Sequence, residues 1–399
     1  MLHKDNFSLN SKKFYKNLNK TKKIFKHFKL ELKNKQLPLL ESFKKKYLFN
    51  FSSGAIKKYS KCKNIIVIGM GGSILGTKAI HSFLNTKVKK EVFFFDNLDL
   101  NLNIKFKKIK NLKDSCFIVV SKSGNTLETI TNFCSFFSEN LMKNKTVFIT
   151  ENKNSSLMEI SNKLNADVIQ HKDFIGGRYS VLSEVGMFPA ALMGLKVLNF
   201  KNFEKLINNK KFISVLIHNV ASIYTLSTEG MKNSVLLNYD LRLNDLCLWY
   251  QQLVAESLGK NRKGISPTIS TCPKDHHSLL QLYLDGPRDK FFTFFSSANK
   301  ESKQNINSKI IPNKMKFIKN KSLNSIINAQ CGATKKIFKS KNILFRSFIF
   351  YKNNESELGY FFTFFVLETI LLAKLMQVNP FNQPAVEKIK VETKKILLK

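Results

Sequence analysis

Short runs of apolar residues, each followed by a stretch with the spacing of a helix, dominate the first half of the chain. Four of these runs are apolar throughout instead of alternating with polar residues, which is typical of strands buried on both faces. Strands of this kind, separated by helices, predict a parallel sheet that helices cover on both sides. The four predicted strands are residues 64–68, 91–95, 116–120 and 146–150.

A second unit of the same kind begins near residue 200. Helices are expected at residues 244–258 and 277–284, and the polar stretch 299–330 fits no element clearly. Strands are predicted at residues 234–239, 291–295 and 346–350.

The two ends of the chain predict helices outside these units. The first 55 residues have the pattern of a lysine-rich amphipathic arm with a break at Pro38. A long apolar helix at residues 358–377 and a short lysine-rich helix close the chain. We therefore expect a helical arm at residues 1–55, α/β domains at residues 56–200 and 201–375, and a C-terminal helical segment at residues 376–399.

The formal net charge of +38 raises the question of a nucleic-acid partner. Only five of the 66 basic residues are arginines, and the lysines are spread along the whole chain. Surfaces that clamp phosphates or read bases favour the planar fork of arginine. The charge therefore indicates a compositional bias toward lysine, and we expect no nucleic-acid partner.

The longest apolar run, residues 358–373, is the stretch that could be taken for a membrane span. It is shorter than the roughly 20 residues that a span needs. It also contains Glu368, and a carboxylate near the bilayer centre costs about 2.5–3.5 kcal/mol. We predict a buried core helix here and no membrane association.

The six cysteines are widely spaced and form no Cys-x-x-Cys pair. This pattern is typical of reduced thiols in a cytoplasmic protein and not of a disulfide framework or a zinc site. His276 and His277 have no cluster of cysteines or acids at ligand spacing, so acid–base chemistry or a helix start is the favoured interpretation for them. We predict a cytoplasmic protein without a bound metal.

The turn Ser121–Thr129 is the strongest candidate for chemistry. It leads from a buried strand into a predicted helix, and its hydroxyl groups could close around a phosphate at the positive end of that helix. Gly124 allows the tight bend that such a cradle needs. An ordinary capped helix start uses the same residue types, so the turn alone leaves phosphate binding and capping equally open.

The glycine run Gly69–Gly76 follows the first predicted strand. Its spacing differs from that of a dinucleotide fingerprint, and the nearest acidic candidate, Asp96, lies 27 residues beyond Gly69 instead of about 20. We interpret the run as backbone that makes room for a sugar or a phosphate, with Ser73 as a hydrogen-bond donor.

Two charged residues stand among apolar neighbours. Arg178 lies in a glycine turn, and an arginine in a lysine-biased chain indicates a need for its planar fork, although a structural arginine at a helix end is the alternative. Glu256 lies near the end of a predicted helix, where a half-buried carboxylate could act as a base near neutral pH. An exposed acid paired with Lys260 is the alternative there.

Taken in order, these motifs resemble the phosphoglucose isomerase family, from about residue 60 to the C-terminus. The glycine–arginine stretch and the Ala-Glu-Ser-x-Gly-Lys stretch are specific to that family, whereas the serine-rich turn is shared by sugar isomerase domains in general. The stretches that carry the resemblance are Gly69–Gly76, Ser121–Thr129, Ile175–Ser183, Ala255–Lys260, His277–Asp289 and Asn379–Lys390.

The resemblance implies two flavodoxin-like sugar isomerase domains with the active site between them, at the interface of a homodimer. It implies the reversible isomerisation of glucose 6-phosphate and fructose 6-phosphate through an enediolate, in glycolysis and gluconeogenesis, without a cofactor. Glu256 is then the base that moves a proton between C2 and C1, and Arg178 steadies the enediolate. His277 of the partner subunit opens the sugar ring with the help of Lys390. The resemblance assigns the phosphate to Ser121, Lys122, Ser123 and Thr126, the sugar to Gly72 and Ser73, and a further substrate contact to Gln383.

The chain departs from the family pattern in a few places. Two adjacent histidines, His276 and His277, stand where one is usual, and Asn382 and Ala385 replace an aspartate and a glycine that are common there. The N-terminal arm is also short. A non-catalytic sugar-phosphate sensor would lack the glutamate and arginine motifs, which are both present. A dual phosphoglucose/phosphomannose isomerase stays open.

Overall fold

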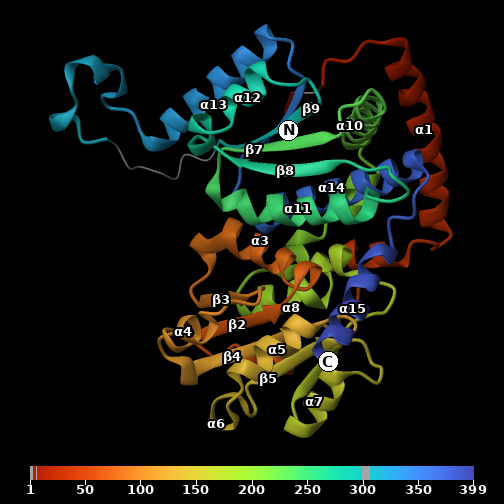
Figure 1. Cartoon of the computed structure of the whole chain (residues 1–399), viewed down its shortest axis with the longest axis vertical. Coiled ribbons are helices and arrows are strands. Elements are labelled where there is room, and N and C mark those ends of the chain that lie inside the picture. The colour runs from red at the N-terminus through yellow and green to blue at the C-terminus, as the bar shows by residue number, and fades with distance from the viewer. Residues whose placement is uncertain (1–2, 6, 299–305) are drawn as a thin grey trace.

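The computed structural model describes residues 3–5, 7–298 and 306–399, and in these residues it contains two five-stranded sheets with helices around them (Figure 1). One sheet is parallel throughout, and the other is parallel except for one edge strand. The predicted α/β class with two parallel sheets and flanking helices is therefore confirmed. The exact domain boundaries at residues 56–200 and 201–375 stay a prediction.

The first sheet has the strand order β3-β2-β4-β5-β6. Its strands are β2 (Asn64–Gly69), β3 (Glu91–Phe95), β4 (Ser115–Val120), β5 (Thr146–Thr150) and β6 (Asp167–Gln170). The four predicted strands are all present. The sequence pattern missed β6, because this short edge strand is only partly buried and carries Asp167 and Gln170 at its ends.

The side chains of the central strands alternate between two cores. Ile65 and Val67 of β2 join the large core that faces the second sheet. Ile66 and Ile68 join a smaller core on the outer face, under α4 (Leu102–Lys107), α5 (Leu127–Phe136) and α7 (Ser156–Leu164). Because successive residues of a strand point to opposite faces, a continuous apolar run is what a sheet covered on both sides requires.

The second sheet has the order β1-β10-β9-β7-β8. Its parallel strands are β7 (Asn233–Asn238), β8 (Ser266–Thr271), β9 (Lys290–Ser297) and β10 (Phe345–Phe350). The three predicted strands are present. β8 was missed because it is an edge strand rich in serine and threonine, with Pro267 at its second position.

The N-terminal arm is only partly helical, which corrects the prediction of a helical arm. The strand β1 (His3–Asp5) pairs antiparallel with β10 at the edge of the second sheet. Helix α1 (Lys12–Lys33) packs against α10 (Lys210–Thr228). A short 3-10 helix begins at Pro38, as expected for the break, and α2 (Ser53–Tyr59) follows.

Four helices lie between the two sheets and join them into one core (Figure 1). They are α3 (Leu75–Leu84), α8 (Glu184–Leu192), α11 (Asn244–Leu258) and α14 (Glu355–Met376). Helix α14 is long and apolar enough to cross a membrane by length and composition, but it is almost wholly buried inside the protein. The predicted core helix is confirmed.

A buried ion pair lies at the centre of this core. Arg346 of β10 contacts Glu368 of α14 with both terminal nitrogens, and neither side chain is exposed. The same guanidinium also donates to Thr293, Asn219 and Tyr250 at 3.0, 3.1 and 3.2 Å. Glu368, which argued against a membrane span, is therefore fully paired inside the core.

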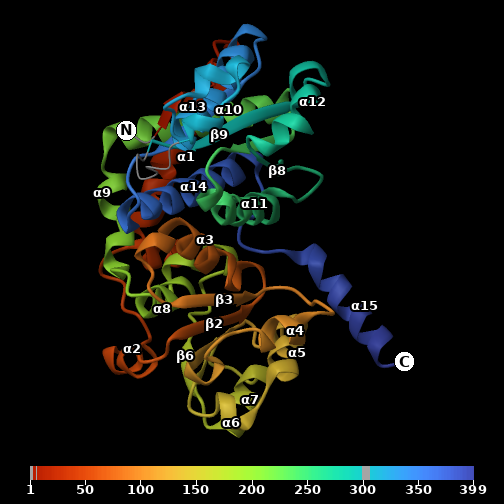
Figure 2. The same cartoon turned by 90° about the vertical axis from the view of Figure 1, so that its left-hand side faces the viewer.

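The remaining helices cover the outer faces of the sheets or stand apart. Helix α13 (Leu323–Ser340) lies mostly beyond the stretch 299–330 that fitted no element, and residues 299–305 of that stretch lie outside the described residues. Helix α15 (Glu387–Leu397) has no buried residue and projects from the body of the molecule (Figure 2). The others are α4 (Leu102–Lys107), α5 (Leu127–Phe136), α6 (Glu139–Met142), α7 (Ser156–Leu164), α9 (Phe203–Ile207) and α12 (Leu280–Asp285).

Candidate active site

The candidate site lies at the point in the first sheet where the chain switches from adding strands on one side to adding them on the other. The chain passes from β2 to β3 on one side and then to β4 on the other, so β2 and β4 are neighbours. Gly69 pairs with Val120, and the loops that follow these two residues leave the sheet side by side. Such a crevice at the carboxyl ends of parallel strands is the usual ligand site of an open α/β sheet.

The turn after β4 has the geometry of an anion cradle. The Ser121 and Thr126 hydroxyls are 2.8 Å apart, and the Gly124 amide donates to Ser121 Oγ at 3.2 Å. Gly124 has a φ of +71°, and a Cβ there would lie 2.2 Å from Ser155 Oγ. Only glycine therefore fits this position.

The amides at the start of α5 favour phosphate binding over an ordinary capped helix. Thr126 occupies the N-cap position, but no side chain in the described chain caps α5, because the Thr126 hydroxyl is turned to Ser121. Ser123 Oγ accepts from the Asn125 amide at 3.2 Å, which shapes the turn. First-turn amides without a capping side chain can bind an anion.

Lys122 points to the neighbouring loops of the sheet. Its ammonium lies 3.4 Å from Glu151 and donates to the carbonyl of Asp173 at 2.6 Å. Lys122 therefore adds positive charge beside the cradle, while its ammonium is held by these two loops.

The glycine run serves contacts within the protein. A Cβ at Gly72 would lie 2.3 Å from the carbonyl carbon of Gly177, so the loop after β2 packs directly on the turn that carries Arg178. Gly71 has a φ of +51°, and a Cβ there would lie 2.8 Å from Gln252 Nε2. The space that a Cβ would take at these two glycines is thus filled by the chain itself, and Ser73 closes the loop through its amide to Met70. The contact of Gly72 and Ser73 with a sugar stays a prediction.

Arg178 connects three distant parts of the chain. Its guanidinium donates to Glu256 Oε1 at 2.8 Å, to Ser257 Oγ at 2.8 Å and to Gln383 Oε1 at 3.0 Å. It also donates to the carbonyls of Pro380 and Asn382 at 2.5 and 3.0 Å. The side chain is only 2% exposed. All three nitrogens of the guanidinium therefore donate hydrogen bonds, as the planar group indicated by the sequence can.

Both carboxylate oxygens of Glu256 are held. Oε1 accepts from Arg178, and Oε2 accepts from Gln252 Nε2 at 2.9 Å. The alternative of an acid paired with Lys260 is wrong, because the contacts of Lys260 are with backbone carbonyls. Gln252 was missed by the sequence reasoning, although its position one helical turn before Glu256 was a usable signal. The Glu256 side chain is 26% exposed, so solvent or a substrate can reach it.

The side chains of Lys260, Tyr179 and Arg178 hydrogen-bond to residues 379–383, which we call the C-terminal strap. Lys260 Nζ donates to the carbonyls of Ser257 and Asn379 at 2.9 and 2.5 Å, and the Tyr179 hydroxyl donates to that of Pro380 at 3.1 Å. Arg178 supplies the remaining contacts described above. Burial, together with the nearby Arg178 charge, lowers the pKa of Lys260 to about 8. The strap is thus the anchored segment from which α15 extends.

We expect Lys260→Met to lower kcat/KM by about 10- to 100-fold, because a displaced strap would misplace Gln383. Lys260→Arg should restore much of the loss. Since the pKa is about 8, the ammonium loses its charge as pH rises from about 7 to 9, and wild-type activity should fall over that range. The fall should move to higher pH in the arginine variant. Wild-type kcat/KM in Lys260→Met would contradict the positioning role.

The histidines lie elsewhere, on the turn after β8 in the second sheet. His277 is exposed, and it makes no contact with Glu256 or Arg178 within the described chain. His276 is half-buried, and its Nε2 lies 2.7 Å from the Tyr239 hydroxyl, which in turn donates to Thr334. Burial and the neighbouring His277 lower the pKa of His276. His276 therefore fixes the turn, and His277 points outward from it.

Lys390 is also away from the cluster. It lies on the exposed helix α15, and its ammonium contacts Glu387 at 2.7 Å. The structure thus brings together Arg178, Glu256 and Gln383. The Gly72 loop packs on the turn that carries Arg178, and the Ser121–Thr126 cradle follows the strand next to that loop. His277 and Lys390 are not brought to this cluster within one chain.

A carboxylate whose orientation is fixed by a guanidinium and an amide can move a proton between neighbouring carbons of a bound sugar. The same guanidinium can stabilise the negative charge that develops on the oxygens. With an anion cradle on the next strand, the fold and the site define an aldose–ketose isomerase of phosphorylated sugars. The sequence profile described as phosphoglucose isomerase matches residues 42–275. The chain belongs to the phosphoglucose isomerase family.

The chain is similar to known proteins both in sequence and in fold. A glucose-6-phosphate isomerase of Methanocaldococcus jannaschii is 32% identical over 344 residues, covering 84% of both chains. A hypothetical protein of Thermus thermophilus has the same fold, with a TM-score of 0.83 at 20% identity over 98% of this chain and 99% of that one. A glucose-6-phosphate isomerase from Chlamydia trachomatis superposes with a TM-score of 0.69 at 19% identity, over 86% of this chain and 72% of that one. The resemblance seen in the motifs is confirmed.

Proposed function

We propose that the chain interconverts glucose 6-phosphate and fructose 6-phosphate through an enediolate. The observation that carries this proposal is the 2.8 Å contact between Arg178 and Glu256, beside the Ser121–Thr126 cradle. A proton transfer next to a carbonyl needs one positioned carboxylate, and the enediolate needs a positive charge that cannot be lost. Glu256 is the base and Arg178 is the fixed charge.

The remaining roles follow the arrangement of the loops. The cradle takes the phosphate at the start of α5, with Ser121, Ser123 and Thr126 as hydroxyl donors and Lys122 as a nearby charge. Gly72 and Ser73 face the sugar from the neighbouring loop. Gln383, held by Arg178, contacts the substrate from the strap.

Ring opening is assigned to His277 and Lys390, and it requires a second copy of the chain. His277 is exposed at the carboxyl end of the second sheet, a position from which it can reach a neighbouring subunit. Lys390 lies on α15, a helix without buried residues that carries exposed apolar side chains such as Ile389 and Ile396. A homodimer with a shared active site would cover this helix. We place the enzyme in the cytoplasm, in glycolysis and gluconeogenesis, without a nucleic-acid or membrane partner.

A coupled assay tests the proposed reaction. Purified protein should convert fructose 6-phosphate into glucose 6-phosphate, detected by a glucose-6-phosphate dehydrogenase that reduces NADP. The rate should be the same with and without a chelator, since no role is assigned to a metal. Mannose 6-phosphate in the same assay tests dual specificity. Absence of turnover with a folded protein would refute the proposed function.

The cradle should act mainly on binding. Ser123→Ala with Thr126→Val should raise KM far more than it lowers kcat, because the phosphate is held in the ground state and in the transition state alike. The measurement is the steady-state kinetics on fructose 6-phosphate. An unchanged KM would place the phosphate elsewhere.

The shared site can be tested with mixed subunits. His277→Ala and Glu256→Gln should each be nearly inactive alone. If His277 acts across the interface, a hybrid dimer contains one site with both natural groups, and about half of the wild-type activity per hybrid should return. Proven subunit exchange without any recovery would show that each subunit uses its own histidine or that His277 has no such role.

A further inference from the structure

The second sheet repeats the topology of the first. In the order β8-β7-β9-β10 the chain again passes from its central strand to one side and then to the other, so β7 and β9 correspond to β2 and β4. The registers also agree, since Asn238 of β7 pairs with Phe295 of β9 as Gly69 pairs with Val120. Ser296 therefore stands where the first domain has Ser121, the first hydroxyl of the cradle.

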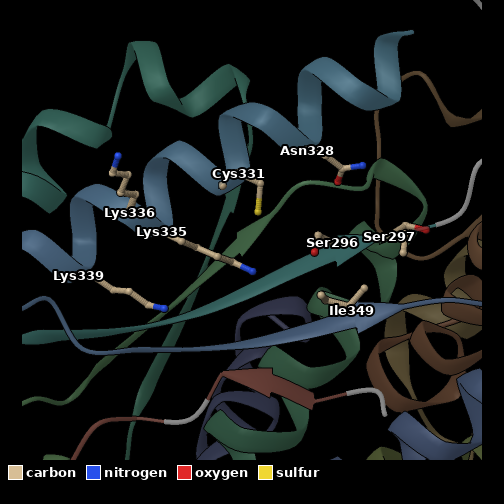
Figure 3. A pocket seen from close by; sticks show the side chains of 10 residues that line it. Ser296, Ser297, Asn328, Cys331, Lys335, Lys336, Lys339 and Ile349 are labelled. Atoms are coloured by element: carbon tan, nitrogen blue, oxygen red, sulfur yellow. The ribbon is translucent and has the colours of Figure 1, made fainter. Parts of the chain in front are cut away.

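A cavity of about 520 Å³ opens at this place, between the ends of β9 and β10 and helix α13 (Figure 3). Ser296, Ser297 and Ile349 form its sheet side, and Lys335, Lys336 and Lys339 line it from α13. Figure 3 shows the Lys335 side chain lying between α13 and the sheet and pointing toward Ser296. A volume of this size suits a small metabolite.

A second cavity of about 810 Å³ adjoins the first and shares Ser297 with it. It covers the ends of β7 and β8 and includes Arg242, Thr271 and Lys274. Arg242 is held by two contacts with Asp240, and its guanidinium donates to Ser297 Oγ at 3.2 Å. These two cavities, which share Ser297 as a lining residue, are together called the hollow, and cationic groups lie along it at the carboxyl edge of the second sheet.

The polar groups of the hollow are those that a phosphate ester would use. Ser296 is only 6% exposed, and its hydroxyl makes no hydrogen bond to any residue of the described chain. Lys335 is half-buried, and its ammonium lies 5.3 Å above the Phe294 ring, which holds it near the strand ends. Most lysines of this chain are exposed, whereas Lys335 is half-buried in a cavity at the position where open α/β sheets bind ligands.

We propose that this hollow is a second binding site, separate from the active site, for a small phosphorylated metabolite. The phosphate lies against Ser296 and Lys335, and the carbon skeleton extends past Ser297 into the larger cavity. Neither Glu256 nor Arg178 takes part. The proposal depends only on the geometry of the second domain and does not require the isomerase roles assigned above.

Calorimetric titration with glucitol 6-phosphate tests the proposal. This open sugar phosphate has no carbonyl group and cannot be isomerised. In about 0.15 M salt, where exposed charges are screened over about 8 Å, the wild type should bind two molecules per chain. The cradle variant Ser123→Ala with Thr126→Val should bind one molecule tightly.

Charge reversal in the cavity separates a site from general attraction by a basic protein. Lys335→Glu in the cradle variant should weaken the remaining binding about tenfold or more, because a charge-assisted contact is lost. Lys341→Glu, on an exposed lysine just beyond α13 that does not line the cavity, makes the same change of charge and should have little effect. Ser296→Ala provides a second variant that keeps the fold and should weaken binding several-fold.

The isomerase assay distinguishes the two sites. Lys335→Glu in the otherwise wild-type chain should keep its kcat for fructose 6-phosphate. One bound molecule per wild-type chain would overturn the proposal. Equal weakening by Lys335→Glu and Lys341→Glu would also overturn it, because the binding would then depend on net charge alone.

Discussion

Glu256→Gln should keep the fold and the binding of sugar phosphate but lower kcat by about 10²–10⁴-fold, the usual contribution of a positioned acid–base group. The amide has nearly the shape of the carboxylate, so the neighbouring Arg178 and Gln252 should stay in place. Its nitrogen cannot take a proton from C2. The measurement is kcat on fructose 6-phosphate, together with the rate at which the C2 proton of glucose 6-phosphate exchanges with deuterated solvent.

Glu139→Gln is the matched control for this prediction. Glu139 is an exposed carboxylate on α6 that pairs with Lys143, so the same chemical change there should leave kcat unaltered. A Glu256→Gln variant with a near-normal kcat would remove Glu256 from the role of base. Loss of proton exchange in step with turnover would support that role.

Arg346→Met should reduce the free energy of unfolding by about 3–5 kcal/mol, because it leaves the carboxylate of Glu368 buried without a counter-charge, with only the Tyr250 hydroxyl donating to it. Asn219 and Tyr250 also lose a charged donor. The effect should appear as a lower midpoint of urea denaturation. Activity measured well below that midpoint should be affected much less, since the pair lies in the core between β10 and α14.

The double variant Arg346→Met with Glu368→Met separates pairing from packing. It should be much less destabilised than the sum of the two single variants, because no buried charge is left unpaired. Lys395→Met, which breaks an exposed pair, should change the midpoint very little. If Arg346→Met were as harmless as Lys395→Met, the buried pair would contribute nothing to stability.

The central strands could be predicted because burial on both faces leaves only apolar residues at consecutive positions. Residues 64–68 and 116–120 carry this signal without interruption. The edge strands β6 and β8 lack it, since one face or one end is open to solvent and polar residues are tolerated there. Helix α13 was not recognised because its amphipathic pattern begins within a long polar stretch.

The site could be predicted only in part, for a similar reason. Arg178, Glu256 and Gln383 were each singled out by their motifs, but nothing in their spacing shows that one guanidinium contacts the other two. Lys260 holds the strap by donating to a backbone carbonyl. Because every residue has such a carbonyl, the sequence pattern does not indicate this contact. The place where His277 acts depends on a second chain and stays a prediction.

Because β1 lies at the edge of the second sheet, the N-terminal segment cannot fold completely until late in translation. Its partner strand β10 begins 340 residues after Asp5, and the α1 helix packs on α10 and α14, which also follow late. At about 5–20 residues per second, a ribosome needs roughly 17–70 seconds to supply that partner strand. The apolar face of α1, with Phe14, Phe25 and Phe28, has no native surface to cover it until α10 has been made, at residue 228. The nascent chain must therefore keep its first segment soluble until more than half of the polypeptide has been synthesised, and we expect that segment to be a binding site for chaperones during translation.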